Sequence, residues 1–146
     1  MANELKTGKE VYLKMPYGDF IIRDNVETVL VAGGTGITAF TSLITDKNKE
    51  FNNRISLLYG ARSKELLIYK DEINENINVK LFAENCDDEN IISGKLSCEE
   101  VIHATENPQD TKFYFSGPPQ MLKSFVEKMH NEYKISEENL LIDAWE

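Results

Sequence analysis

The stretch VLVAGGTGIT, residues 29–38, places three glycines directly after a run of apolar residues. Gly34, Gly36 and Ala39 match the pattern G-x-G-x-x-A, which binds phosphate groups where it follows a strand and opens a helix. Glycine has no Cβ, so a ligand can approach the main chain closely, and free N–H groups at a helix start favour an anion such as a pyrophosphate. The alternative interpretation is a tight strand-to-helix turn that binds no ligand.

From this stretch to the end of the chain, apolar β-forming runs alternate with longer segments of helical periodicity. This alternation predicts an α/β fold: a doubly wound five-stranded parallel sheet in the strand order 3-2-1-4-5, with flanking helices. The expected strands cover residues 28–32, 54–61, 78–84, 112–117 and 139–145. The expected helices cover residues 38–50, 64–75, 99–105 and 118–133, and a capping box at Ser97 and Glu100 opens the third of them.

The first 25 residues do not follow this alternation. Two short strands are expected at residues 10–14 and 19–22, joined by a Pro-Tyr-Gly turn. A lone β-hairpin is only marginally stable in water, so it must contact the sheet, pair with another chain or be the remainder of a β domain. We therefore expect a hairpin segment over residues 1–25 and a sheet domain over residues 26–146.

The composition is that of one globular domain, with 146 residues, 41% of them hydrophobic, and a formal net charge of −9. An acidic surface does not attract a phosphate backbone, so nucleic acid is not an expected partner. No apolar run approaches the roughly 18 residues that a membrane span needs. Two cysteines without CxxC spacing favour free thiols in a reducing, cytoplasmic compartment. His103 and His130 have no third ligand nearby in sequence, so no metal site is expected.

One position departs from the common dinucleotide-binding fold. In that fold an acidic residue about twenty positions after the glycines, at the end of the second strand, binds the ribose diol. The corresponding residues of this chain are Tyr59, Gly60, Ala61 and Arg62. The first acidic residue at a strand end is Glu84, after the third expected strand, so the nearest carboxylate lies one strand further along.

A resemblance to a known family accounts for this departure. The motifs VLVAGGTGIT, LLYGAR followed by LLIYKDEI, and FYFSGPPQM resemble, in this order, the pyridine-nucleotide domain of the ferredoxin–NADP reductase family. That family includes cytochrome b5 reductases, flavohaemoglobin reductase domains and oxygenase reductases. The opening segment LKTGKEVYLKMPYGDFII is similar to the last strands of the family's flavin-binding barrel. Residues 1–25 would then be a remnant of that barrel, and residues 26–146 the pyridine-nucleotide-binding domain.

The resemblance also implies roles for individual residues. The glycine turn would wrap the pyrophosphate, Thr38 would cap the first helix, and Arg62 would lie near a phosphate or stack on the adenine. The segment from Ser116 to Met121 would border the nicotinamide, and Ser116 stands where most members have a cysteine close to the hydride-donating carbon. The implied cofactor-binding residues are Gly33, Gly34, Thr35, Gly36, Ile37, Thr38, Tyr59, Gly60, Arg62, Glu84, Gly117, Pro118, Pro119 and Met121, and the implied catalytic residue is Ser116.

The loop after the third expected strand bears on the choice of cofactor. Members that prefer NADP offer serine or arginine groups to the 2′-phosphate there, whereas this chain has AENCDDEN at residues 83–90. A phosphate would meet like charge at Glu84, Asp87 and Asp88, while a free 2′-hydroxyl could donate a hydrogen bond to Glu84. NAD(H) is therefore favoured over NADP(H). The alternative is that the acidic loop is a solvated surface turn.

The family's flavin-binding stretch, Arg-x-Tyr-Ser/Thr, does not occur in this sequence. FAD or FMN would therefore be held by an absent domain or by a partner subunit, and the chain alone would be inactive. The implied function is to deliver hydride from NADH to that flavin, with a redox protein as a candidate acceptor beyond it. Two alternatives stay open: a flavodoxin-like FMN carrier, and a non-catalytic nucleotide-sensing subunit whose hairpin pairs with a partner's sheet edge. Trp145 would either shield the flavin or pack against the domain.

Overall fold

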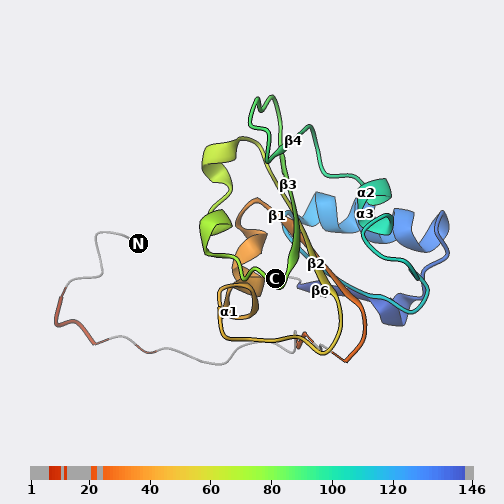
Figure 1. Cartoon of the computed structure of the whole chain (residues 1–146), viewed down its shortest axis with the longest axis horizontal. Coiled ribbons are helices and arrows are strands. Elements are labelled where there is room, and N and C mark those ends of the chain that lie inside the picture. Colours follow the sequence, from red (N-terminus) through yellow and green to blue (C-terminus); the bar gives the residue numbers. More distant parts are fainter. Residues whose placement is uncertain (1–6, 11, 13–20, 23–24, 144–146) are drawn as a thin grey trace.

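Six parallel strands form one sheet in the computed structural model, which describes residues 7–10, 12, 21–22 and 25–143 (Figure 1). The strand order is β4-β3-β2-β1-β5-β6, so the chain runs outward from β1 in one direction and then crosses to its other side. Ligands bind at such a reversal of strand order in open α/β sheets, outside the carboxyl ends of the strands. The strands are β1 (Thr28–Gly33), β2 (Ile55–Ala61), β3 (Asn78–Ala83), β4 (Ile92–Ser93), β5 (Lys112–Ser116) and β6 (Leu140–Asp143).

The predicted α/β class and the order of the five predicted strands are confirmed, and β4 is an additional strand at one edge. β4 pairs with the end of β3 through Phe82 opposite Ile92 and Ala83 opposite Ser93. The Gly94 N–H donates to the Ala83 carbonyl at 2.9 Å and extends this pairing by one bond. A strand of two residues is too short to produce a recognisable alternation of apolar and polar residues, so the sequence pattern missed it.

The two faces of the sheet bury separate apolar clusters because helical segments cover both of them. Figure 1 shows α2 (Cys98–Ile102) and α3 (Pro119–Asn131) on one side, and α1 (Thr41–Ile44) on the other. The remaining helical segments are the 3-10 helices η1 (Gly34–Phe40), η2 (Lys64–Leu66), η3 (Lys70–Glu72) and η4 (Glu137–Asn139). All six residues of β1 are buried, as expected for a central strand whose alternate side chains enter opposite clusters.

The helix predicted over residues 64–75 is wrong. The segment instead forms η2 and η3, separated at Tyr69, whose backbone adopts a left-handed conformation with φ of 61°. Hydrogen bonds with groups outside the segment take the place of helical ones: the Tyr59 hydroxyl donates to the Leu66 carbonyl at 3.0 Å, and the Asn74 N–H donates to the Ile44 carbonyl at 2.6 Å. The buried Asn74 amide also donates to the carbonyl of Lys49 at 3.0 Å.

The other predicted helices exist but are shorter. The one expected over residues 38–50 begins earlier, as η1, and ends at Ile44. The Ser97 cap is confirmed, because its hydroxyl oxygen accepts the Glu100 N–H at 3.3 Å at the start of α2. α3 begins with Pro119 at its first turn, where the missing N–H costs no hydrogen bond. The buried residues of this helix are Leu122, Phe125 and Met129, whose spacing places them on one face.

Two turns at the carboxyl ends of β1 and β5 are packed backbone against backbone. A Cβ placed on Gly36 would overlap the Ser116 carbonyl and would come within 2.6 Å of the Gly117 nitrogen. On Gly117, a Cβ would lie 3.2 Å from the Cα of Gly33. The absence of side chains at these positions therefore lets the β1–η1 turn and the β5–α3 turn touch.

The predicted hairpin lies mostly outside the described residues, as does Trp145, so the hairpin, the proposed division of the chain at residue 25 and the role of Trp145 stay predictions. Two described residues of this segment contact the sheet domain. The Tyr114 hydroxyl donates to the Ile21 carbonyl at 3.1 Å, and Ile22 packs against the apolar cluster beneath α1.

We expect Gly36→Ala to lower the free energy of unfolding by about 3 kcal/mol or more, because the added methyl would overlap backbone atoms that no rotamer change can move. Thr35→Ala is the matched control, since Thr35 is in the same turn with an exposed side chain, and it should change stability by less than about 0.5 kcal/mol. Urea unfolding followed by circular dichroism measures both. Equal stability of the two variants would contradict the packing described for these turns.

The two cysteines should differ sharply in reactivity. Cys98 is 5% exposed in the core below α2, and burial raises the pKa of its thiol to about 11. Because the thiolate is the reactive form, only about one Cys98 in a thousand would be ionised at pH 8. Ellman's reagent at pH 8 should therefore titrate the partly exposed Cys86 in the native protein, and Cys98 only after unfolding. A rapidly reacting thiol in native Cys86→Ser protein would be inconsistent with this structure.

Candidate functional site

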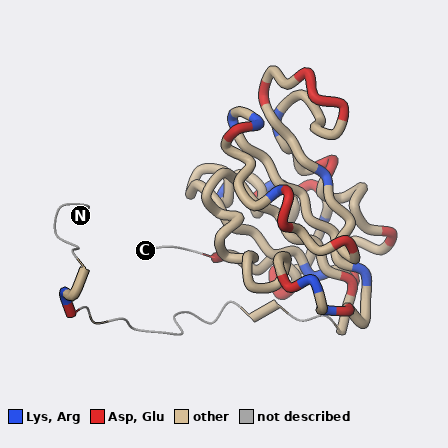
Figure 2. The backbone as a smooth tube through the Cα atoms, turned by 60° about the vertical axis from the view of Figure 1, so that its left-hand side comes forward, with Lys and Arg blue, Asp and Glu red and all other residues tan. Residues whose placement is uncertain are grey.

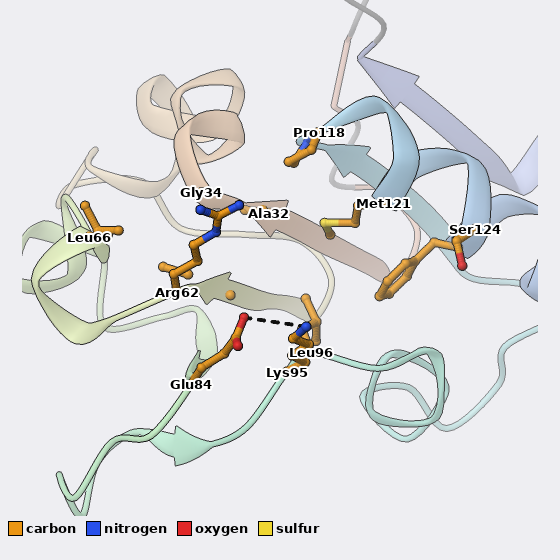
Figure 3. Close-up of a pocket in the computed structure, with 14 residues that line it drawn as sticks. Ala32, Gly34, Arg62, Leu66, Glu84, Lys95, Leu96, Pro118, Met121 and Ser124 are labelled. Atoms are coloured by element: carbon orange, nitrogen blue, oxygen red, sulfur yellow. Dashed lines mark ion pairs between the residues drawn. The ribbon is translucent and has the colours of Figure 1, made fainter.

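A cavity of about 490 Å³ opens at the carboxyl ends of β1, β2 and β3, between these strands and α3 (Figure 3). It lies beside the point where the strand order reverses, the expected place for a ligand in this kind of sheet. Its wall is mainly apolar, with a few charged side chains. The lining residues are Ala32, Gly33, Gly34, Gly60, Ala61, Arg62, Leu66, Glu84, Lys95, Leu96, Pro118, Met121, Ser124 and Phe125.

The three glycines at the end of β1 and in the turn after it differ in their surroundings. A Cβ on Gly33 would overlap the Met121 sulfur, and a Cβ on Gly36 would overlap the backbone of β5. Contacts within the protein therefore favour glycine at both positions, while Gly33 also lines the cavity. Gly34 differs, because its φ is 54° and no atom lies within 4 Å of a Cβ built there. Gly34 is therefore where the main chain leaves open space for a ligand at the cavity wall.

The expected capping role of Thr38 is wrong. Its hydroxyl donates to the Thr35 carbonyl at 2.8 Å, inside η1, and neither η1 nor α1 has a side-chain cap at its start. The helix itself is also weaker than the motif predicts, because it is a 3-10 helix of seven residues followed by only four residues of α-helix. The macrodipole of this element can contribute less to anion binding than that of a long α-helix, so more depends on Gly34 and on nearby cations.

Arg62, at the end of β2, supplies one such cation. Figure 3 shows its side chain directed from the end of β2 toward Gly34, across the cavity. The prediction that Arg62 lies near a phosphate or stacks on the adenine stays a prediction, and its place in the cavity wall is compatible with either role. Because the whole chain carries a net charge of −9, a cation at this position makes the cavity electrostatically distinct from most of the surface.

Glu84 and Lys95 face each other at the mouth of the cavity. The Lys95 Nζ lies 3.8 Å from Glu84 Oε1, and the side chains of Lys95 and Glu84 are 79% and 39% exposed, respectively (Figure 3). Of the acidic residues in the loop after β3, Glu84 lines the cavity, whereas Asp87 and Asp88 do not. Figure 2 shows this acidic loop at one end of the molecule. Glu84 is therefore the residue of this loop from which we expect the main repulsion of a phosphate bound in the cavity.

A second hollow of about 400 Å³ lies between η1 and the β5–α3 turn, and Pro118 borders both spaces. It gathers most of the remaining predicted residues, which are Thr35, Gly36, Thr38, Ser116, Gly117 and Pro119. The Ser116 hydroxyl donates to the Asp143 carboxylate at 3.1 Å, across the paired strands β5 and β6. Ser116 is fully buried, so its hydroxyl is fixed by Asp143.

Two predicted residues do not face either space. The side chains of Ile37 and Tyr59 are fully buried in the apolar cluster beneath α1. Burial raises the pKa of the Tyr59 phenol, which keeps it a neutral hydrogen-bond donor to the Leu66 carbonyl. Both residues shape the site from below through packing.

Sequence reasoning also missed several lining residues: Ala32, Ala61, Leu66, Lys95, Leu96, Ser124 and Phe125. Ser124 and Phe125 are on the predicted α3 helix, three and four residues after Met121, so helical spacing alone could have brought them to the same wall. Lys95 and Leu96 follow β4, the strand that the pattern did not reveal. No sequence signal marked them.

The described part of the chain shows no trio of His, Cys, Asp or Glu side chains that could hold a metal ion. His103 ends α2, and the His130 Nδ1 lies 3.1 Å from the Ile135 carbonyl. Within residues 7–10, 12, 21–22 and 25–143, none of the helices has both the length and the apolar character needed to cross a bilayer.

Comparison with solved structures shows the same fold in larger proteins. The flavohaem-like FAD/NAD-binding domain of nitric oxide dioxygenase from Vibrio cholerae O1 biovar El Tor matches with a TM-score of 0.73 at 16% identity, covering 89% of this chain and 56% of that one. The CS-b5R domains of human Ncb5or, in an NAD+ form, match with a TM-score of 0.68 at 16% identity, covering 88% and 40% of the two chains. At these identities the likeness establishes the fold.

Curated relatives are similar in sequence over almost the whole chain. One subunit of the Na(+)-translocating NADH-quinone reductase from Neisseria meningitidis serogroup C / serotype 2a is 30% identical over 154 aligned positions, and its counterpart from Marinomonas sp. (strain MWYL1) is 32% identical. Each alignment covers 95% of this chain and 38% of the relative, so the chain spans well under half the length of these proteins.

The family assignment rests on a match across the part of the chain that builds the cavity. The family profile described as "Oxidoreductase NAD-binding domain" matches residues 30–127, from the middle of β1 to near the end of α3. This range includes the glycine turn, Arg62, the Glu84–Lys95 pair and the β5–α3 turn. The chain therefore belongs to the oxidoreductase NAD-binding domain family, whose fold it shares with ferredoxin reductase-like proteins.

Proposed function

We propose that this chain is the NAD(H)-binding module of a flavin-dependent oxidoreductase, which positions the dinucleotide so that hydride passes to a flavin held by another domain or subunit. The observation that carries the proposal is the open space at Gly34 opposite Arg62, at the carboxyl end of the central strand. A bare backbone and a guanidinium together suit a diphosphate. The dinucleotide and the flavin supply the hydride chemistry, and the protein supplies binding and orientation.

The remaining lining residues fit the other parts of a dinucleotide. Leu96, Met121 and Phe125 provide apolar surface against which flat rings can pack. A methyl placed on Gly60 would lie 3.2 Å from the Leu96 Cβ, so Leu96 packs closely against the end of β2 in the cavity wall. A ligand here would lose water from its ring faces while its charged groups stay near Arg62 at the open side.

Glu84 supports a preference for NAD(H) over NADP(H). Its carboxylate is 39% exposed at the cavity mouth, where it can accept a hydrogen bond from a ribose hydroxyl. A phosphate group at the same place would meet a like charge. The preference is part of the proposal and rests on this single carboxylate of the acidic loop.

Ser116 and Asp143 support the proposal that the nicotinamide binds near the end of β5. The serine hydroxyl is buried and held by Asp143, and its backbone borders the hollow next to Pro118. A fixed serine at this strand end would keep the β5–α3 turn rigid beside the reacting ring, which is a requirement for orienting two reactants. In this proposal Ser116 keeps the position that the resemblance gives it, anchored by a residue that the sequence did not single out.

The flavin site is proposed to lie outside this chain. The chain covers 38% of the length of its NADH-quinone reductase relatives, and one solved structure of the same fold is described as a FAD/NAD-binding domain. A partner domain with its own flavin site is consistent with both findings. If the purified chain shows no visible flavin absorption, that result would support a flavin site outside this chain over the flavodoxin-like alternative. A flavin bound to the purified chain would support the flavodoxin-like alternative instead.

We expect the chain to bind NADH, and Arg62→Gln to weaken binding by about tenfold through loss of the cation beside the diphosphate. Isothermal titration calorimetry measures both dissociation constants. Arg54→Gln is the matched control, because Arg54 lies at the opposite end of β2 in ion pairs with Glu27 and Glu106 at 3.9 and 3.4 Å. Undetectable NADH binding by the unaltered chain would overturn the proposed function, and equal losses in both variants would remove Arg62 from the site.

A further inference from the structure

Lys95 is held at the cavity wall by its two neighbours in the chain. On one side, the Gly94 N–H donates to the Ala83 carbonyl at 2.9 Å, which ties this segment to the end of β3. On the other side, Leu96 packs against the apolar cluster below α2 and α3 and contacts the strand at Gly60. The backbone at Lys95 is therefore fixed, while its side chain is 79% exposed and can reach across the mouth of the cavity.

Lys95 forms an ion pair with Glu84, in which Lys95 Nζ lies 3.8 Å from Glu84 Oε1. Glu84 directly follows β3 and Lys95 follows β4, so the pairing of these two strands brings the charges together. Figure 3 shows the pair below Arg62, with both side chains lining the same cavity. An exposed pair of this kind adds little to stability, so it can be removed without unfolding the protein.

We propose that Lys95 is a specificity-determining residue for the 2′ position of the dinucleotide, and that Glu84 suppresses it. This inference rests on the proposed function, since it concerns the same cavity. With Glu84 present, the carboxylate takes the ammonium group and offers an acceptor to a 2′-hydroxyl. Without Glu84, Lys95 is a cation at the cavity mouth with no opposing carboxylate among the lining residues, an arrangement suited to a 2′-phosphate, while Arg62 stays beside the diphosphate.

The Glu84–Lys95 pair therefore contains one group that favours NADH and one that favours NADPH. A 2′-hydroxyl needs an acceptor and no cation, and Glu84 supplies it. A 2′-phosphate needs a cation and no carboxylate, and Lys95 supplies it once Glu84 is neutral. The acidic loop alone would predict that neutralising Glu84 merely relaxes the choice. The Lys95 ammonium predicts that the preference shifts actively toward NADPH, and that this shift disappears when the lysine is also removed.

The experiment measures dissociation constants for NADH and NADPH by calorimetry, using the 146-residue chain and the variants Glu84→Gln, Lys95→Gln and the double variant. In Glu84→Gln we expect the NADPH-to-NADH affinity ratio to rise by about tenfold or more. The double variant should lose most of that rise. Raising the salt concentration should weaken NADPH binding by Glu84→Gln more than NADH binding, because the new contact is between charges.

Glu100→Gln is the matched control. Glu100 is about as exposed as Glu84 and forms an ion pair with Lys80 at 2.9 Å, and neither Glu100 nor Lys80 lines the cavity. The control variant changes the net charge by the same amount as Glu84→Gln. Its affinity ratio should equal that of the unaltered chain. An unchanged NADPH-to-NADH affinity ratio in Glu84→Gln would overturn the inference, and so would a rise that persists in the double variant. In either case, binding of NADH would leave the proposed function intact. Absence of binding by every protein would overturn the proposed function itself.

Discussion

The geometry of the site depends on one backbone contact, in which the turn after β1 meets the turn after β5 at Gly36, Ser116 and Gly117. These two turns begin on neighbouring strands at the point where the order of the sheet reverses. A side chain at Gly36 would separate them, and the second hollow would no longer have its present walls. The contact thus fixes the distance between the cavity and Ser116, which the proposed function needs to bring two reacting rings together.

Charge distribution is the second constraint. The chain is strongly acidic as a whole, and an acidic loop lies close to the cavity, yet the lining contains two cations and one carboxylate. This local reversal of sign suits an anionic ligand in a chain that would otherwise repel it. It also means that single substitutions at the mouth have larger consequences for ligand choice than their small effect on stability suggests.

Much of the fold followed from periodicity and apolar content. The alternation of buried strands with helical segments was enough to predict the central strand order and a helix over residues 118–133, where the structure has α3. The segment at residues 64–75 could not be predicted in this way. Its own sequence favours a helix. However, the Tyr59 hydroxyl donates to the Leu66 carbonyl inside the segment, and the Asn74 side-chain amide donates to the Lys49 carbonyl outside it. Local patterns do not contain such tertiary contacts.

The candidate site was predicted in part for the same reason. Gly34 and Arg62 directly follow strands that the pattern revealed, so their place at the cavity could be expected. Lys95 and Leu96 follow a two-residue strand whose existence depends on its partner, and no local pattern marks either residue. The glycines show a further limit: the motif marked Gly34 and Gly36 alike, whereas Gly36 is required for backbone packing and Gly34 has a left-handed backbone beside open space.

The parallel pairing of β1 with β5 also sets an order of events during synthesis. β1 is made before β5, its partner on one side, and β2, β3 and β4 with their connections come between them. A nascent chain on the ribosome can complete the β1–β2–β3 half and still lack the backbone that Gly36 must meet. Both spaces therefore gain their full walls only when β5, the turn after it and α3 have emerged, since Ser116, Gly117 and residues of α3 line them.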